Sequence, residues 1–174
     1  MQVSHHKVIC TIVENSFHIP AIRFKSFLEL GCYRGNSVCE HISGLEKVVA
    51  VDIRDNNTLP AHVKFMHCST DAFFDNNTDT FDAIFIDADH EFNQVLKDFR
   101  SSLKILNPRG LIFLHDTDPI TEHFTAPGLC NNSYLAIMEL EKEYEFNLIN
   151  LPITSEGLGI VQLKDNTRVR IWQR

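Results

Sequence analysis

Short hydrophobic runs, which predict β-strands, alternate along the chain with amphipathic segments, which predict helices. The strand-like runs are residues 26–30, 48–52, 63–67, 82–87, 111–116, 146–152 and 157–163. The clearest helix is expected over residues 91–106, where apolar side chains recur at helical spacing opposite charged ones, and further helices are expected at 36–43 and 133–144. This alternation is typical of a doubly wound, mostly parallel α/β sheet.

Composition narrows the class of protein. The chain has 174 residues, 44% of them hydrophobic, which is enough for one globular domain with a full core. Its net charge of -7 argues against a broad nucleic-acid surface, and no apolar run approaches the roughly 20 residues that span a bilayer. The five cysteines are odd in number and form no Cys-x-x-Cys pair, which favours a reducing compartment. We expect a cytoplasmic protein without a cleaved leader.

A glycine-containing segment follows the first predicted strand. Glu29 lies near the end of that strand, and Gly31 and Gly35 follow in the pattern Glu-x-Gly-x-x-x-Gly. Ligands of open parallel sheets bind beyond the carboxyl ends of the strands, where glycines let the backbone turn and approach them. Asp52 ends the second strand, at the place where nucleotide sites hold ribose hydroxyls with a carboxylate. The segment therefore predicts a nucleoside-containing cofactor.

The glycine spacing distinguishes two kinds of cofactor. A dinucleotide site requires Gly-x-Gly-x-x-Gly, but Tyr33 and Asn36 stand where its second and third glycines belong. Glu29 favours a cationic ligand and gives no help to a phosphate. A nicotinamide dinucleotide is therefore disfavoured. The alternative reading is that Gly31 and Gly35 only form a tight turn between a strand and a helix.

The pattern resembles motif I of the class I S-adenosylmethionine-dependent methyltransferases, and the resemblance extends over nearly the whole chain. Residues 67–74 are similar to the segment that contacts adenine, and residues 81–119 resemble the central block of small sugar and macrolide O-methyltransferases. The resemblance implies a Rossmann-like fold over residues 1–174, as one domain with seven strands and an antiparallel last strand. The cofactor-binding residues that it implies are Glu29, Gly31, Tyr33, Gly35, Ser37, Asp52, Ile53, Ser69, Thr70, Asp71 and Asp87. This block departs from the family at Ala88 and Arg109, which replace glycines of two turns.

Carboxylates and imidazoles gather after the fourth and fifth strands. They are Asp87, Asp89, His90, His115, Asp116 and Asp118. Strands four and five should be neighbours, and like charges brought so close repel unless protons or a cation neutralise them. A divalent ion with oxygen ligands would satisfy them, and the alternative is that these carboxylates only cap loops or contact the cofactor through water.

The resemblance assigns roles within this group. It implies magnesium or manganese at Asp87, His115 and Asp116, although His115 stands where relatives often have glutamate, so that a softer ion or no ion is the alternative. His90 is the expected catalytic base, with Asp87 beside it, because an imidazole of pKa near 6.5 accepts a proton at neutral pH. The alternative for His90 is capping of the helix 91–106. No role is assigned to the other histidines, which include His5 and His6.

We therefore predict O-methylation of a small polar acceptor, such as a sugar hydroxyl. Residues 1–25 would form a short N-terminal cap, residues 117–132 a lid over the acceptor, and a second copy of the chain could close the site. One alternative is a nucleoside-binding module without catalysis, which serves as a subunit of a larger assembly. The other is an oxidoreductase that uses NAD, for which the chain lacks the glycines and a substrate domain.

Overall fold

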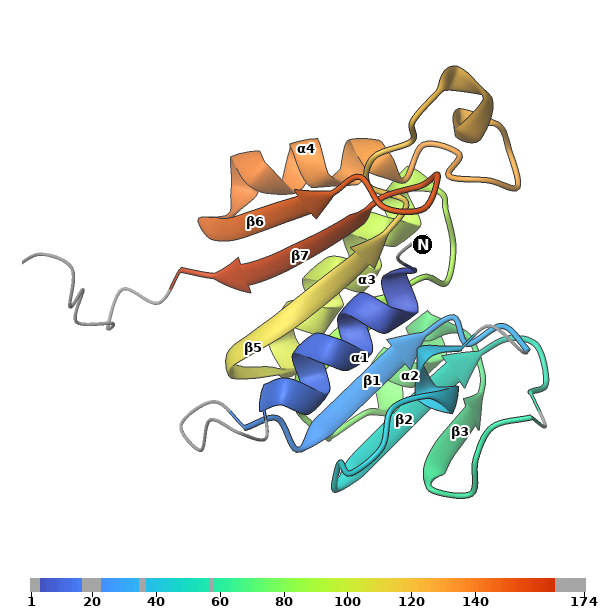
Figure 1. The fold of residues 1–174 in the computed structure, drawn as a ribbon, viewed down its shortest axis with the longest axis vertical. Coiled ribbons are helices and arrows are strands. Elements are labelled where there is room, and N and C mark those ends of the chain that lie inside the picture. The colour runs from blue at the N-terminus through green and yellow to red at the C-terminus, as the bar shows by residue number, and fades with distance from the viewer. Residues whose placement is uncertain (1–3, 17–22, 35–36, 57, 165–174) are drawn as a thin grey trace, which may run out of the picture.

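A seven-stranded sheet forms the centre of the molecule (Figure 1). The computed structural model describes residues 4–16, 23–34, 37–56 and 58–164. The strands are β1 (Ser26–Leu30), β2 (Lys47–Asp52), β3 (Val63–His67), β4 (Phe81–Ile86), β5 (Leu106–His115), β6 (Phe146–Leu151) and β7 (Leu158–Leu163). Their order is β3-β2-β1-β4-β5-β7-β6; β7 pairs antiparallel with β5 and β6, and the other pairs of neighbouring strands are parallel. The predicted Rossmann-like sheet with an antiparallel last strand is confirmed.

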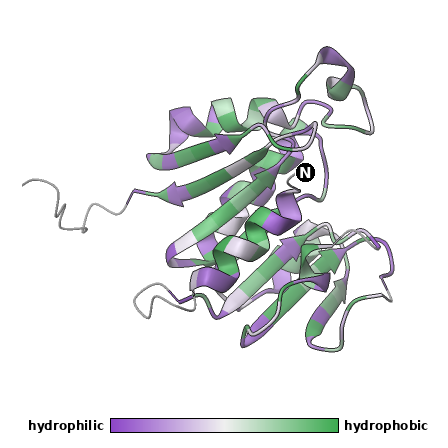
Figure 2. Ribbon diagram, viewed as in Figure 1, coloured by the Kyte–Doolittle hydropathy of each residue, from purple (hydrophilic) through white to green (hydrophobic). Residues whose placement is uncertain are grey.

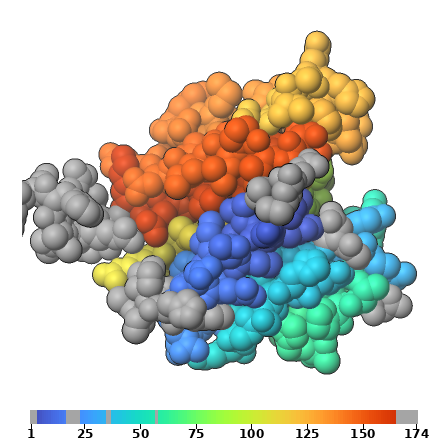
Figure 3. Space-filling model, viewed as in Figure 1, coloured from blue at the N-terminus to red at the C-terminus, as the bar shows by residue number. Residues whose placement is uncertain are grey.

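Helices cover both faces of this sheet. They are α1 (His5–Asn15), α2 (Thr70–Asn76), α3 (Phe92–Ile105) and α4 (Tyr134–Glu143), with the 3-10 turns η3 (Val38–Glu40) and η4 (Glu122–Thr125). Helix α1 and η3 pack on one face, and α2, α3 and α4 pack on the other. Figure 3 shows α1 lying across the middle of its face, at the molecular surface. None of the helices in the described ranges is long and apolar enough to cross a membrane.

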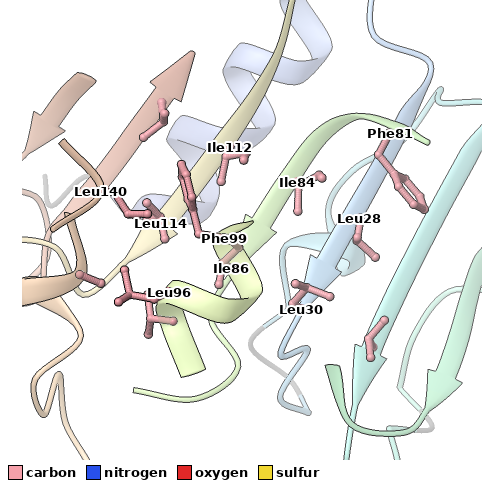
Figure 4. Packing of buried hydrophobic residues seen from close by; sticks show 14 of the residues in the cluster. Leu28, Leu30, Phe81, Ile84, Ile86, Leu96, Phe99, Ile112, Leu114 and Leu140 are labelled. Carbon is pink, nitrogen blue, oxygen red and sulfur yellow. The ribbon is translucent and has the colours of Figure 1, made fainter. Parts of the chain in front are cut away.

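Two hydrophobic clusters follow from the pleat of the strands, because alternate residues point to opposite faces. Leu28, Ile84 and Ile112 point to the face covered by α3, where they pack near Phe99 of that helix (Figure 4). Residues of the opposite parity pack against α1, and the central strands are hydrophobic along most of their length (Figure 2). Burial on both faces explains why these strands read as continuous apolar runs.

Three local features differ from expectation. The helix expected at 36–43 is only the 3-10 turn η3, and the chain then turns at Gly44 with φ +76°. Helices α1 and α2 were not anticipated; α1 forms within the predicted N-terminal cap of residues 1–25. The turn expected before strand five lies within β5, where the pairing with β4 shifts register between Phe81 and Ala83. Arg109 adopts φ +68° there, a backbone shape that glycine takes more easily.

Candidate active site

The carboxyl ends of β1, β2 and β4 surround a pocket of about 280 Å³. Its lining includes Gly31, Asp52, Ile53, Thr70, Ala88 and Gln94. These residues come from the loops after β1, β2 and β4, from the end of β2, and from the first turns of α2 and α3. The pocket therefore lies at the edge of the sheet where the sequence predicts a cofactor.

Gly31 allows the loops after β1 and β4 to pack closely beside this pocket. Its φ is +86°, and a Cβ atom placed on it would lie 2.1 Å from the carbonyl oxygen of Asp87. The loops after β1 and β4 are thus packed backbone against backbone, and Asp87 N donates to Leu30 O at 2.8 Å. Only glycine permits this approach. The second predicted glycine, Gly35, lies outside the described residues.

Glu29 and Ser37 support the loop after β1 from beneath. The Glu29 side chain is fully buried and accepts hydrogen bonds from Ser37 Oγ (2.6 Å), Val38 N (2.8 Å) and Cys39 N (2.8 Å). Burial raises the pKa of Glu29 to about 7, although these hydrogen bonds favour its charged form. Glu29 was expected to face a cationic ligand, and Ser37 to contact the cofactor. The structure instead turns both side chains toward the chain itself, because η3 needs acceptors for its free N–H groups.

Asp52, Ile53 and Tyr33 are accessible from solvent. Asp52 Oδ1 accepts a hydrogen bond from Arg54 N at 2.7 Å, and the residue lines both the main pocket and an adjoining one of about 270 Å³. Ile53 is 69% exposed and lines the main pocket, whereas Tyr33 is 59% exposed and lines the adjoining one. An exposed isoleucine at a pocket offers a flat apolar surface to a planar ligand.

Gln94 is a pocket residue that the sequence did not single out. Its Nε2 donates to Thr70 Oγ1 (3.1 Å), Asp71 Oδ1 (3.3 Å) and Asp98 Oδ1 (2.9 Å). Three acceptors around one atom fix the orientation of the amide, so Oε1 is the atom left to accept from another group. Ser69 caps α2 by accepting from Ala72 N at 3.2 Å. No helical periodicity marks Gln94, because its significance depends on α2 lying beside α3.

Asp98 lies behind Gln94 and is fully buried. Its Oδ2 has no hydrogen-bond partner among the described residues. Burial raises the pKa of this carboxyl to about 6, because the charged form loses its hydration. The amide that lines the pocket is therefore held from behind by a carboxyl that is poorly hydrated.

A second group of polar side chains lies at the ends of β4 and β5. His115 Nδ1 is 2.9 Å from Asp116 Oδ1 and 3.2 Å from Asp87 Oδ1. His90 Nδ1 is 2.9 Å from Asp116 Oδ2, and His90 Nε2 is 3.6 Å from Asp87 Oδ1. We call these four residues the His–Asp cluster. Of the six residues expected to gather here, the structure brings these four into contact, whereas Asp89 only borders the cluster and Asp118 is not among the residues around it. Asp87, His90 and Asp116 each offer an atom with mutual separations within 4.8 Å.

Opposite charges shift the ionisation of this cluster. The carboxylates of Asp116 and Asp87 raise the pKa of His90 to about 11. Burial alone would lower the pKa of His115, but the same carboxylates outweigh it and raise that pKa to about 10. The two imidazoliums in turn hold the pKa of Asp116 well below its usual range, against the effect of burial. Without a metal ion the cluster is thus two ion pairs at neutral pH, and His90 is already protonated.

Residues 117–132 close one side of the cluster. The carbonyl of Leu129 accepts a hydrogen bond from His90 Nδ1, and Asn132 Oδ1 accepts from Phe92 N at 2.6 Å. Ser133 Oγ donates to Asp116 O at 3.0 Å, while Asp116 itself has φ +59°, a conformation that costs energy in a non-glycine residue. The segment is therefore anchored to the cluster at its C-terminal end, and its role as a lid stays a prediction.

His5, to which the sequence assigned no role, lies against the cluster. Its ring centroid is 4.3 Å from that of His115, and its side chain packs on Phe85. Figure 1 shows the N-terminal end of α1 near the carboxyl end of β5, which explains this contact. No sequence spacing could relate residue 5 to residue 115, because only the docking of α1 on the sheet joins them.

Comparison with known proteins identifies the family. The model of the methyltransferase-domain family matches residues 28–117, which span both the pocket and the His–Asp cluster. The chain belongs to this family. Among curated proteins, no sequence matches the chain.

Solved structures confirm the fold of the methyltransferase domain. An O-methyltransferase from Bacillus cereus, solved with SAH, has a TM-score of 0.68 and 17% identity over 94% of this chain and 83% of its own. The Podospora anserina methyltransferase PaMTH1, also bound to SAH, has a TM-score of 0.68 and 15% identity over 92% and 78%. The Streptomyces achromogenes O-methyltransferase TomG, in complex with SAM, has a TM-score of 0.61 and 12% identity over 94% and 92%.

Proposed function

We propose that this methyltransferase domain uses S-adenosylmethionine to methylate a hydroxyl group of a small polar acceptor, such as a sugar. The observation that carries the proposal is the placement of the pocket beside the His–Asp cluster. Ala88 and Asp89 line the pocket, and Asp89 also borders the cluster, so the two regions meet in the loop after β4. A methyl donor in the pocket would thus adjoin groups able to take up a proton.

The pocket residues fit an adenosyl group. Asp52 would accept hydrogen bonds from the ribose hydroxyls, and Ile53 would contact one face of the adenine. Gln94 Oε1 would accept a hydrogen bond from the adenine amino group, because its Nε2 is already fixed on α2 and Asp98. Glu29 would act indirectly, by holding the loop that contains Gly31 and Tyr33.

His90 is the proposed base. The bound cofactor supplies a methyl group on a positively charged sulfur, and the acceptor hydroxyl must lose its proton as it attacks. His90 Nδ1 donates to the carbonyl of Leu129, so Nε2 is the nitrogen available to the acceptor. Because Asp87 and Asp116 raise the pKa of His90, this role requires that something else neutralise those carboxylates.

A divalent cation at Asp87, His115 and Asp116 would meet this requirement. The proposal of magnesium or manganese at these residues is supported by the two carboxylates, whose charge such an ion balances. The orphaned nitrogens of His115 are the part of the donor set that suits magnesium least. We also propose that the protein acts in the cytoplasm and that residues 117–132 move to admit the acceptor. A second copy of the chain would then cover the acceptor in a homo-oligomer.

A second candidate is a nucleoside-binding module without catalysis. The space enclosed at the His–Asp cluster is only about 10 Å³, too little for an acceptor unless residues 117–132 move. Binding without turnover on a broad panel of acceptors, with and without divalent metal, would favour this candidate.

Calorimetric titration with S-adenosylmethionine, S-adenosylhomocysteine and NAD tests the cofactor. We expect the two sulfur nucleosides to bind and NAD not to bind. Binding of NAD alone would overturn the proposal and favour an oxidoreductase.

A further inference from the structure

We propose that His5 of α1 joins His115, Asp87 and Asp116 in one binding site for a zinc-class divalent ion, which accepts nitrogen as well as oxygen ligands and would take the place of magnesium or manganese. The site would contain two imidazoles and two carboxylates, and His90 would stay outside it as the proposed base. The use of this ion in methyl transfer rests on the proposed function, but its binding does not.

Unsatisfied polar atoms concentrate at this one place. Among the described residues, five buried side-chain nitrogen or oxygen atoms without a hydrogen-bond partner lie here. They belong to His5 (Nδ1 and Nε2), His115 (Nδ1 and Nε2) and Asp116 (Oδ2), whereas Asp98 and Ser102 have one such atom each elsewhere. Native proteins rarely leave such atoms unpaired, and a bound ion is one of the groups that satisfy them.

The close contacts of His115 have the spacing of metal ligands and lack the alignment of hydrogen bonds. His115 Nδ1 is 2.9 Å from Asp116 Oδ1 and 3.2 Å from Asp87 Oδ1, yet it makes no hydrogen bond. Two ligands of one tetrahedral zinc ion, each about 2.0–2.2 Å from it, are about 3.4 Å apart. The distances from His115 Nδ1 to the two carboxylate oxygens are near this value, so small shifts would let the three atoms share one cation.

His5 is the one proposed ligand that comes from a helix, α1, and not from the end of a strand. Its side chain is buried to all but 8%, and its ring meets the edge of His115 with an interplanar angle of 63°. Packing on Phe85 fixes the ring, and neither nitrogen has a partner in the described chain. Leaving both nitrogens of a buried imidazole unsatisfied costs free energy, which a metal bond to one of them would offset.

The donor chemistry selects the class of ion. Two carboxylates balance a charge of +2, so neutral imidazoles can complete the shell without excess charge. Magnesium retains water and prefers oxygen ligands in octahedral geometry, whereas zinc binds imidazole nitrogen and carboxylate oxygen readily. Because His5 begins α1, such an ion would also fasten this helix to the carboxyl edge of the sheet.

Metal titration of the full chain, first stripped with a chelator, tests the site. We expect one zinc ion to bind at least a hundredfold more tightly than magnesium. Cobalt should give visible absorption bands of a site with nitrogen ligands. His5→Phe, which preserves the packing on Phe85, should weaken zinc binding at least tenfold, whereas His123→Phe, at an exposed histidine on η4, should leave it unchanged. Equal affinity for magnesium and zinc, or a His5→Phe variant that binds zinc as well as the parent chain, would overturn the proposal.

A measurement on the unaltered chain covers the case in which His5→Phe does not fold. With ¹⁵N-labelled histidine, addition of zinc should shift ring-nitrogen signals of His5 and His115, and unmoved His5 signals would refute its role. Titration with S-adenosylhomocysteine on the same samples separates the two proposals. Zinc binding without nucleoside binding would defeat the proposed function alone, and nucleoside binding without zinc binding would defeat this inference alone.

Discussion

The pocket beside β1 and β2 and the His–Asp cluster beside β4 and β5 occupy the same edge of one sheet, yet they are built differently. The pocket is open, and its prominent side chains, Asp52 and Ile53, are accessible to solvent. The cluster is buried, internally charge-paired and closed by residues 117–132. The pocket is open to solvent, whereas the charged groups of the cluster face one another and are closed off from it.

The contrast has a physical origin. The shape of the pocket comes mainly from backbone, through the close approach of Gly31 to Asp87 and the hydrogen bonds that Glu29 accepts from η3. The cluster comes from side chains of two separate segments, residues 87–90 and 115–116, which the pairing of β4 with β5 brings together. Substitutions of exposed pocket residues should therefore weaken nucleoside binding and leave the stability of the fold unchanged. Substitutions in the cluster should lower the stability of the fold and have less effect on nucleoside binding.

The largest effect is expected from Asp116→Asn. Removing one charge of a buried, paired group leaves the two imidazoliums with Asp87 as their single counter-charge in the cluster, which should cost about 3–5 kcal/mol of unfolding free energy at pH 7. Because the folded-state pKa of Asp116 is lowered, its contribution is present above the usual 3.8 and is lost as pH falls. Urea denaturation at pH 7 and pH 3 measures this difference. The exposed Asp89 is the control, and equal losses for Asp89→Asn would contradict the contrast.

Asp98→Asn tests the buried carboxyl behind the pocket. Its contribution to stability should change with pH in the opposite direction from that of Asp116, because its pKa is raised and not lowered. The pKa of Asp98 is raised from 3.8 to about 6, so the parent chain loses stability as pH rises through that window. We expect the loss, about 2–3 kcal/mol, to be absent from the variant. Denaturation curves between pH 4 and pH 8 test this, with the exposed Asp75→Asn as the control. Parallel curves for parent and Asp98→Asn would refute the assignment.

Asp52→Ala should change binding with little effect on the fold. Loss of the ribose partner should weaken S-adenosylhomocysteine binding about tenfold, equivalent to about 1.4 kcal/mol. Calorimetry gives the affinity and thermal denaturation gives the stability. The nearby exposed Asp55→Ala serves as the matched variant. Unchanged affinity in a folded Asp52→Ala protein would remove the ribose from this position.

The smallest effect is expected from Gln94→Leu, which keeps the size of the side chain and removes its amide. Affinity for S-adenosylhomocysteine should fall about fivefold, because one neutral hydrogen bond contributes about 1 kcal/mol. Adenosine and inosine test whether the lost affinity comes from the adenine amino group, because inosine lacks that group. The parent chain should bind adenosine more tightly than inosine, and the variant should bind the two equally. A variant that keeps the preference would show that another group recognises the amino group.

The sequence predicted the framework well because the framework depends on local patterns. The strands β1 and β3 begin and end where the hydrophobic runs do, and α3 follows its apolar periodicity to within a residue. Helix α2 was missed because seven residues are too few for a periodic signal. The helix expected at 36–43 did not form beyond η3, where Glu29 accepts from the turn.

The sequence by itself determined the order of the strands along the chain, the glycine turn at Gly31 and the strand ends that carry Asp52, Asp87 and Asp116. These are properties of neighbouring residues, which local backbone preferences and alternation of side chains dictate. Tertiary structure alone decided that Glu29 supports a loop, that Gln94 enters the pocket and that His5 lies on His115. Such contacts join distant parts of the chain, and they exist only once helices have docked on the sheet and excluded water from the groups between them.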